Sequence, residues 1–537
     1  MKSEPLAASA ALPDSRGLNL FSSDPGFDAL LALYLPQSLH AHLRPHLERL
    51  GALAGGELDA LALVADKHPP ELRNRTRAGE DRQWVDKHPA YRRLEEVAFS
   101  EYGLAAMSHR AGVLGWPRPL PPIAKYALSY LYVQAEFGVC CPLSMTDALA
   151  RTLSRFGEPS LVARYLPGLL SQDMDSLTQG AMFMTEQGAG SDVGATATRA
   201  VRDDEGWRLY GDKWFCSNAD AELALVLARP DGAPPGTRGL SLFLLPRTLD
   251  DGAPNRYRVV RLKDKLGTRD MASGEIRLEG ALAHLVGDPA RGFVQMADMI
   301  NLSRLSNGMR AAGMMRRALT EALFWSRNRI AFGRRLIDMP LMRRQLLKLM
   351  LPTEAARSML LYTAAQLELA DAGDEAARRR VRLLTPLFKF RACRDARRVT
   401  GDAMEVRGGC GYIEEWSDAR LVRDAHLGSI WEGTSNIVAL DVLRAIRREH
   451  ALDSLVTEFP QDPGLEQAAA FAAGADEAHA RQAATALYYA TVAAILSREG
   501  ERLPRRRTLA DMVRAHRLEP RDPFGKTAAD FEALLDA

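Results

Sequence analysis

The spacing of apolar residues changes twice along the chain. From about residue 46 to 175, apolar positions recur every three or four residues, which is the period of an amphipathic helix. Between Gly180 and about Gly287 this period gives way to short β-leaning runs, and after Asn301 the helical period returns and lasts to about Arg448. The pattern therefore predicts a helical block, a sheet block and a second helical block.

Within the middle block, five runs predict individual strands. They cover residues 206–217, 223–229, 239–247, 256–262 and 274–280. Gly, Asp and Pro residues separate them, as expected of turns in a small sheet or barrel domain. In the following helical block, Met315, Leu319 and Leu323 recur at four-residue steps, and the small residues 311–313 allow close contact with another helix.

The two ends of the chain differ from these blocks. Residues 1 to about 45 are punctuated by Pro and Ser and predict an arm rather than a core segment. The last segment is Ala-rich, begins as helix and ends in a basic stretch. We expect an α+β fold, mainly α, whose parts are an N-terminal arm (1–45), a helical domain (46–178), a central β domain (179–292), a C-terminal helical bundle (293–448) and a helical extension (449–537).

Composition excludes several classes of protein. The chain has 537 residues, 47% of them hydrophobic, and its 70 basic and 68 acidic residues leave a formal charge of only +2, so nucleic-acid binding would need a local patch. Five cysteines without a CxxC pair or a zinc-like spacing predict reduced thiols and no metal site. The sequence has no apolar signal-peptide core and no run long enough to span a bilayer, which indicates a cytoplasmic protein.

One carboxylate has a setting that favours chemistry. Glu432 lies between Trp431 and a Gly433-Thr434 turn, directly before the apolar helical run that ends at Leu443. Apolar surroundings raise the pKa of a carboxyl group, and such a base can take a weakly acidic proton near neutral pH. An acidic residue that faces the dipole at the start of a helix is an equally simple interpretation of this segment alone.

A glycine-rich loop opens the sheet block. In the segment Met184 to Thr196, Gly188, Gly190 and Gly194 let the backbone approach a ligand, and neighbouring hydroxyls could bind a phosphate or a heterocycle. The spacing fits neither a Rossmann nor a P-loop fingerprint. A tight polar loop without a ligand remains the alternative.

Three further segments could contribute to a binding site. Residues 213–218 (KWFCSN) offer a ring and a hydroxyl, residues 327–333 (RNRIAFG) offer cations beside an aromatic ring, and residues 405–412 (EVRGGCGY) expose backbone amides. Taken singly, each has a purely structural explanation: an amphipathic strand, a basic helix end and a helix-terminating turn.

The order of these motifs is much more specific than any one of them. MTEQGAGSDV, GDKWFCSN, RNRIAFG, EVRGGCGY and RDAHLGSIWEGTSN follow one another as in the acyl-CoA dehydrogenase flavoprotein family, which the chain resembles over roughly residues 90–446. Within the family the chain is similar to the AidB-like branch, on the evidence of KHPPEL (67–72), KHPAYRRL (87–94), RLKDKLGTRDMAS (261–273) and a C-terminal extension. That branch also contains dehydrogenases of fatty acyl-CoA.

The resemblance implies FAD-binding roles for the matched residues. The loop residues Met184, Thr185, Gly190 and Ser191 would hold the flavin, Thr185 at the isoalloxazine and Ser191 at the pyrophosphate. Ser217 occupies the place of the hydroxyl nearest flavin N5, and Phe215 the place of a Trp that shields the ring. Further contacts would come from Thr434 and Asn436 and, toward the FAD of a neighbouring subunit, from Arg329, Phe332, Glu405, Gly408 and Gly409.

The resemblance also implies a reaction. Glu432 falls on the catalytic base and would remove the α-proton of an acyl-CoA thioester, while the β-hydrogen leaves as hydride to flavin N5. Arg304 stands where the family often contacts the CoA phosphates, although a surface arginine explains it as well. Trp431 replaces a more usual Tyr, which leaves the acyl chain length open, and Glu405 replaces a Gln. A homotetramer and an electron acceptor such as an electron-transfer flavoprotein are implied.

Two other functions remain as alternatives. The AidB resemblance suggests a DNA-associated protein that protects against alkylation, with little dehydrogenase turnover. Residues 447–537 contain about a dozen basic and about fifteen acidic residues, however, and the only dense basic cluster is Arg502, Arg505, Arg506 and Arg507, which disfavours extensive duplex binding. A flavin-bearing scaffold without turnover is the second alternative, and the intact Glu432 argues against it.

Overall fold

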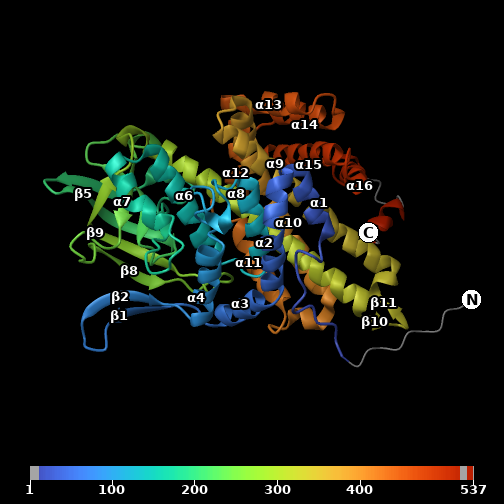
Figure 1. Cartoon of the computed structure of the whole chain (residues 1–537). Coiled ribbons are helices and arrows are strands. Elements are labelled where there is room, and N and C mark those ends of the chain that lie inside the picture. The colour runs from blue at the N-terminus through green and yellow to red at the C-terminus, as the bar shows by residue number, and fades with distance from the viewer. Residues whose placement is uncertain (1–10, 521–528, 536–537) are drawn as a thin grey trace, which may run out of the picture. The chain divides into compact units, whose positions relative to one another are not determined.

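The computed structural model describes residues 11–520 and 529–535 of the chain. These residues form two compact units. Unit 1 comprises Met1–Asp59, Pro122–Ala135 and Arg304–Ala537, and unit 2 comprises Ala60–Pro121 and Glu136–Ser303. Each unit is described by itself below, with the element labels of Figure 1.

Unit 2 is built around a seven-stranded sheet. Its strands are β3 (Gly180–Phe183), β4 (Arg199–Asp203), β5 (Gly206–Ser217), β6 (Leu223–Pro230), β7 (Ser241–Pro246), β8 (Tyr257–Leu262) and β9 (Ser273–Leu285). Their order is β3-β6-β4-β5-β9-β7, with β8 on β9, and an additional pairing of β6 with β7 closes the path into a barrel-like ring. The five strands predicted from the sequence are confirmed, and β3 and β4 are additional.

Alternating side chains of these strands form the core of unit 2. Leu209, Phe243, Ile276 and Ala281 are all fully buried. Along β5 and β9 the core residues alternate with more exposed ones, whereas every residue of β7 is buried. Two helices, α6 (Cys140–Phe156) and α7 (Pro159–Leu169), lie beside the sheet, and α6 packs on β3 (Figure 1). The sheet therefore has one helix-covered flank.

A β-hairpin interrupts the segment whose pattern predicts only helices. After α3 (Glu57–Lys67), strands β1 (Glu71–Arg75) and β2 (Asp81–Asp86) pair antiparallel, and α4 (Pro89–Glu95) follows. Pro69 and Pro70 end the helical run, because proline cannot donate to a helical ladder. Few apolar residues mark the hairpin, so the periodicity of its neighbours hides it. Helix α4 continues directly into the π-helix Glu96–Glu101.

Unit 1 is helical. Its main helices are α5 (Pro122–Tyr132), α8 (Gly292–Asn328), which begins in unit 2, α9 (Pro340–Asp371), α10 (Glu375–Arg407), α11 (Ser417–Gly428) and α12 (Ser435–Glu449). Helix α10 packs against α9, α11 and α12. The predicted close contact at the small residues of α8 is confirmed, because a Cβ on Gly313 would lie only 2.2 Å from Val133 Cγ1. Met315 and Leu319 are fully buried.

The ends of the chain also belong to unit 1. The segment that the sequence predicts as an arm contains α1 (Pro25–Tyr34) and α2 (Gln37–Gly55), and it buries Phe27, Leu30 and Leu43 completely, so it is a core segment from residue 25 onward. The extension contains α13 (Ala451–Glu458), α14 (Pro463–Gly474), α15 (Ala480–Glu499) and α16 (Pro504–Val513), and α15 packs on α9, α10 and α12. Within the described residues, every helix is too short or too polar to cross a bilayer.

Candidate functional site

Glu432 lies in a strained turn between α11 and α12. Its φ of 55° and the φ of 98° at Gly433 are both in the left-handed region, which glycine adopts readily and glutamate rarely. The turn ends where α12 begins, at Ser435. A left-handed residue persists only where its surroundings hold it, and such residues concentrate at functional sites.

Two cations hold the carbonyl oxygens of this turn. Arg304 on α8 donates from Nε to the Glu432 carbonyl at 3.1 Å, and Lys389 on α10 donates from Nζ to the Gly433 carbonyl. Lys389 is only 1% exposed, and this burial lowers its pKa to about 8. The two contacts fix consecutive peptide groups from two different helices, so the backbone that carries Glu432 has a defined direction.

Arg304 is also engaged with a second partner. Its Nη1 lies 2.7 Å from Asp441 on α12, and Asp441 in turn accepts from Arg382 at 2.9 Å. Burial opposes ionisation of Asp441, but the two arginines hold its pKa below the usual value. The predicted contact of Arg304 with CoA phosphates remains a prediction, and a phosphate would have to compete with Asp441 for the guanidinium.

Trp431 is half-buried beside a buried arginine. The guanidinium carbon of Arg310 lies 5.0 Å from the centre of the Trp431 ring, within the range of a cation–π contact. Arg310 is 1% exposed and donates to Ser306 at 3.2 Å. The ring that precedes Glu432 is therefore restrained by α8. Thr434 and Asn436, which follow Glu432, are exposed at the start of α12.

The predicted cofactor contacts at the end of α10 lie on an open turn. Glu405, Gly408 and Gly409 are all exposed, and a Cβ on either glycine would meet no atom within 4 Å. Gly408 has a φ of 72°, which explains why glycine is required where the helix ends. The backbone of the turn is therefore accessible to a ligand.

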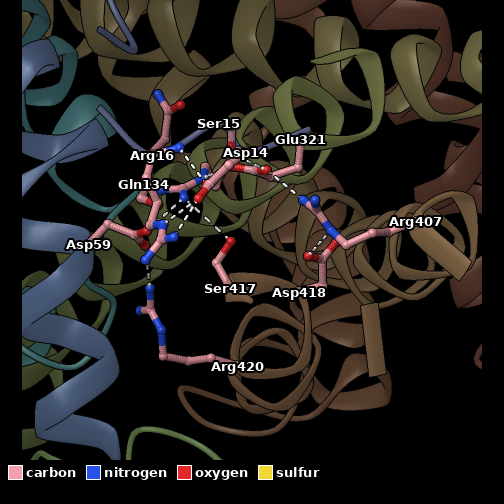
Figure 2. A network of polar contacts seen from close by, with 11 residues as sticks. Asp14, Ser15, Arg16, Asp59, Gln134, Glu321, Arg407, Ser417, Asp418 and Arg420 are labelled. Carbon is pink, nitrogen blue, oxygen red and sulfur yellow. Dashed lines mark hydrogen bonds and ion pairs between the residues drawn. The ribbon is translucent and has the colours of Figure 1, made fainter. Parts of the chain in front are cut away.

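A buried polar network includes Arg407, the residue before this turn (Figure 2). Arg407, next to Gly408, donates to Asp418 at 2.7 Å and to Glu321 at 2.5 Å, and Ser15 donates to Glu321 at 2.6 Å. A second branch joins Arg317 and Arg420 to Asp59. Three arginines thus meet three carboxylates, and each charge is compensated, as a buried network requires.

Arg329 and Phe332 lie at the far end of α8. Arg329 is half-buried, while Phe332 is 93% exposed in the short hairpin of β10 (Ile330–Ala331) and β11 (Arg334–Arg335) (Figure 1). A φ of 51° turns Phe332 outward. The ring is therefore accessible to a ligand or to another chain.

In unit 2, a buried ion pair anchors the glycine-rich loop. Glu186, in the loop, lies 2.7 Å from Lys213 Nζ on β5, and it also accepts from the backbone of Ala197 and Thr198. Burial opposes ionisation of Glu186, but Lys213 holds its pKa below the usual value, while burial lowers the pKa of Lys213. The sequence did not predict this ion pair, although Glu186 lies within MTEQGAGSDV and Lys213 is the first residue of KWFCSN.

The residues predicted to contact the flavin in unit 2 lie near this ion pair. The Thr185 carbonyl accepts from the Trp214 amide at 2.8 Å, and Lys213 donates to the Met184 carbonyl at 3.3 Å, so the loop and the end of β5 lie side by side. Phe215 is 60% exposed, Ser217 is half-buried, and Gly190 and Ser191 are exposed. Unit 2 thus brings together the loop, the ring and the hydroxyl.

These residues fit a flavin nucleotide on two observations. A Cβ on Gly188 or Gly190 would meet no atom within 4 Å, so the loop backbone is open to a bulky ligand. The exposed Phe215 lies two residues before Ser217 on β5. Its apolar face suits a planar ring. In unit 1 the open Gly408-Gly409 turn is accessible in the same way.

Comparison with known proteins gives the chain its family. Residues 11–176 match the N-terminal domain of the adaptive response protein AidB, residues 181–281 the middle domain of acyl-CoA dehydrogenases, and residues 290–447 their C-terminal domain. The putative acyl-CoA dehydrogenase AidB of Escherichia coli is 36% identical over 428 residues, which cover 76% of this chain and 75% of that protein.

Two comparisons with a nematode protein agree. Acyl-CoA dehydrogenase family member 11 of Caenorhabditis elegans is 33% identical over 437 residues, 79% of this chain and 70% of that one. The crystal structure of C. elegans ACDH-11 in complex with C11-CoA has a TM-score of 0.85 at 27% identity and covers 97% of this chain and 94% of that chain. The chain therefore belongs to the acyl-CoA dehydrogenase family of FAD-dependent oxidoreductases, in its AidB-like branch.

Proposed function

We propose that the protein desaturates an acyl-CoA between its α and β carbons, with Glu432 as the base. The observation that carries this proposal is the left-handed turn at Glu432, which two cations from α8 and α10 hold by its carbonyl oxygens. A base works when it is fixed within hydrogen-bonding reach of the proton it takes, and strain stored in a fixed turn is typical of such a site.

The residues of unit 1 have separate tasks in this proposal. Glu432 receives the α-proton on its carboxylate. Arg304 and Lys389 hold the turn, and their positive charges favour the ionised form that a base needs. Trp431, restrained by Arg310, forms an apolar wall next to the base and excludes water from it.

The residues of unit 2 hold the cofactor. Bound FAD supplies the acceptor for the two electrons that leave the substrate. The loop from Met184, with Thr185, Gly190 and Ser191, places backbone amides and hydroxyls around it, and Glu186 and Lys213 keep the loop on β5. Phe215 would lie against the flavin ring, and the Ser217 hydroxyl would donate a hydrogen bond to its edge. C. elegans ACDH-11 was crystallised with C11-CoA, which supports an acyl-CoA as substrate.

Anaerobic titration of the purified holoenzyme with a panel of acyl-CoAs tests the proposal. Flavin absorbance near its visible maximum should bleach with at least one straight-chain or branched acyl-CoA, and the product should be the 2-enoyl-CoA. Stable flavin absorbance with every acyl-CoA of the panel would instead favour the scaffold interpretation.

We further propose a homotetramer in the cytoplasm that passes electrons to a protein acceptor such as an electron-transfer flavoprotein. The 93% exposed Phe332 and the open Gly408-Gly409 turn support subunit contacts, because an apolar ring gains from being buried and the open turn leaves room for another chain. Light scattering of the FAD-loaded protein should give four times the chain mass. A monomer with full FAD occupancy would contradict the assignment of Arg329, Phe332 and Glu405 to a neighbour's cofactor.

DNA-associated alkylation protection remains the second candidate, because residues 11–176 match the AidB N-terminal domain. The basic cluster of the extension supports it less than the sequence indicates. Arg506 is 4% exposed and paired with Glu354 and Glu499, and Arg505 donates to the Leu534 carbonyl. Only Arg502 and Arg507 of that cluster are exposed, which leaves two cations for DNA phosphates.

A further inference from the structure

The proposed reaction does not use the KHPAYRRL segment, yet its lysine lies deep in unit 2. The Lys87 side chain is 10% exposed and lies between two carboxylates, 3.2 Å from Glu95 Oε1 and 3.0 Å from Asp220 Oδ2. Burial lowers the pKa of Lys87, but Asp220 and Glu95 raise it above the ordinary value for lysine. Lys87 is therefore a permanent cation that joins α4 to the segment after β5.

A chain of hydrogen bonds leads from Lys87 to the end of β5. Glu95 Oε1 also accepts from Gln179 Nε2 at 3.0 Å, and Gln179 Oε1 accepts from Asn218 Nδ2 at 3.1 Å. A carboxylate can only accept, so Glu95 forces the amide of Gln179 to turn its NH2 group toward Glu95 and its oxygen toward Asn218. The orientation of one amide thus depends on an ionised Glu95, which Lys87 compensates.

Asn218 is the residue directly after Ser217, and its conformation needs support. Its φ is 54°, a left-handed value that asparagine tolerates better than most residues. It is 1% exposed, its amide donates to the Ala272 carbonyl at 2.8 Å, and its side chain also donates to the Gly180 carbonyl at 3.2 Å. This turn sets where β5 ends, and therefore where the Ser217 side chain starts.

We propose that Lys87 is a positioning residue for Ser217. It acts on the turn by two routes, through Glu95, Gln179 and Asn218, and directly through Asp220, two residues further along the same turn. The inference rests on the proposed function in one respect, the assignment of the Ser217 hydroxyl to the edge of the flavin. Lys87 itself has its contacts with Glu95, Asp220 and the Tyr91 ring.

Two variants interrupt the relay at different points. Lys87→Met removes the cation, and Gln179→Leu removes the middle amide while Lys87 keeps its ion pair with Asp220. In the full-length holoenzyme we expect both to retain FAD, to shift the visible spectrum and midpoint potential of the bound flavin, and to slow its reduction by acyl-CoA about 3- to 10-fold, the effect of one misplaced hydrogen bond. The double variant should be less than additive, because both changes act on one relay.

Arg93→Gln is the matched control. Arg93 belongs to the same motif but pairs with Glu96 and Glu101 at the surface, so its loss should leave spectrum, potential and rate unchanged. Wild-type spectrum and potential in both relay variants, or equal shifts in the control, would overturn the inference. If Lys87→Met fails to fold, the spectrum and midpoint potential of Gln179→Leu alone test the inference. Chemical reduction gives the potential without substrate, so failure of the proposed acyl-CoA reaction is seen separately.

Discussion

The glycine-rich loop of unit 2 and the Glu432 turn of unit 1 are each held by a buried lysine, but the two lysines have different partners. In unit 2, Lys213 lies 2.7 Å from Glu186, a carboxylate of the loop that it holds. In unit 1, Lys389 donates to the carbonyl of Gly433, and among the described residues no carboxylate forms an ion pair with it. Burial lowers the pKa of both lysines, that of Lys389 to about 8.

Because their partners differ, we expect the two lysines to affect different properties of the protein, one its stability and the other its catalytic rate. A buried ion pair costs several kcal/mol when one partner is lost, because the other charge stays buried without compensation. The hold of Lys213 on the loop should therefore appear as stability and cofactor retention. A lysine that faces a carbonyl and titrates near pH 8 should instead appear in the rate and its pH dependence.

The largest expected effect comes from Glu432 itself. Glu432→Gln keeps the size and polarity of the side chain but cannot take the α-proton, so flavin reduction by acyl-CoA should fall about 10²- to 10⁴-fold with FAD content unchanged. Stopped-flow absorbance under anaerobic conditions measures it. Glu415→Gln, at an exposed carboxylate of the same unit, is the control and should react as wild type. An unchanged rate in Glu432→Gln would place the base elsewhere.

The next effect should come from the ion pair of unit 2. Glu186→Gln leaves Lys213 buried opposite a neutral amide, so we expect a loss of about 3 kcal/mol of stability and weaker FAD retention. Thermal unfolding monitored by flavin fluorescence gives both quantities. Asp231→Asn, which removes a surface pair with Arg199, should cost less than about 1 kcal/mol. Equal losses in the two variants would show that the loop does not depend on this pair.

A smaller effect should distinguish Lys389. Removing its charge disfavours the carboxylate of Glu432, so Lys389→Met should move the acidic limb of the pH–rate profile to higher pH by a fraction of a unit. Lys389→Gln retains a donor for the Gly433 carbonyl and separates charge from hydrogen bonding. If the pH–rate profile of both variants matches that of the wild type, Lys389 holds the turn but does not influence the ionisation of Glu432.

The same lysine makes a prediction for stability. Its pKa is about 8 in the fold and 10.5 for an ordinary lysine, so between these values the unfolded chain binds more protons. Stability must then rise with pH through this window, by up to about 3 kcal/mol from this group. Burial of the ammonium is unfavourable below pH 8. Urea unfolding should show that the free energy of unfolding of the wild type rises relative to that of Lys389→Met as the pH increases from 8 to 10.5. If the two free energies change in parallel with pH, the assignment is contradicted.

DNA binding should show the smallest effect. With Arg506 buried in an ion-pair network, only Arg502 and Arg507 of the 502–507 cluster are exposed to phosphates, so duplex affinity should stay on the order of 10⁻⁴–10⁻⁶ M and vanish at moderate salt. Arg502→Gln/Arg507→Gln tests this in electrophoretic shifts without disturbing the network that Arg506→Ala would break. Nanomolar binding lost in this double variant would favour the DNA-associated candidate.

Much of the fold could be predicted from local pattern. The five strands between residues 206 and 280 and the long helices are confirmed, because alternation and a 3.6-residue period report directly on which side of an element faces the core. The hairpin at 71–86 and the helical structure between residues 25 and 45 could not. Their burial depends on partners far away in the chain, and the local texture of Pro, Ser and charged residues is typical of loops. The five-part domain division stays a prediction.

The sequence by itself determined the family and its FAD dependence and predicted Glu432 as the base, because all three follow from motifs whose order along the chain is specific. Only the tertiary structure decided what supports them. Lys389 lies 44 residues from Gly433 along the chain, Lys213 lies 27 residues from Glu186, and Lys87 lies 8 residues from Glu95. A buried charge is recognised by its compensating partner, and that partner is brought close by the fold and not by the spacing of residues.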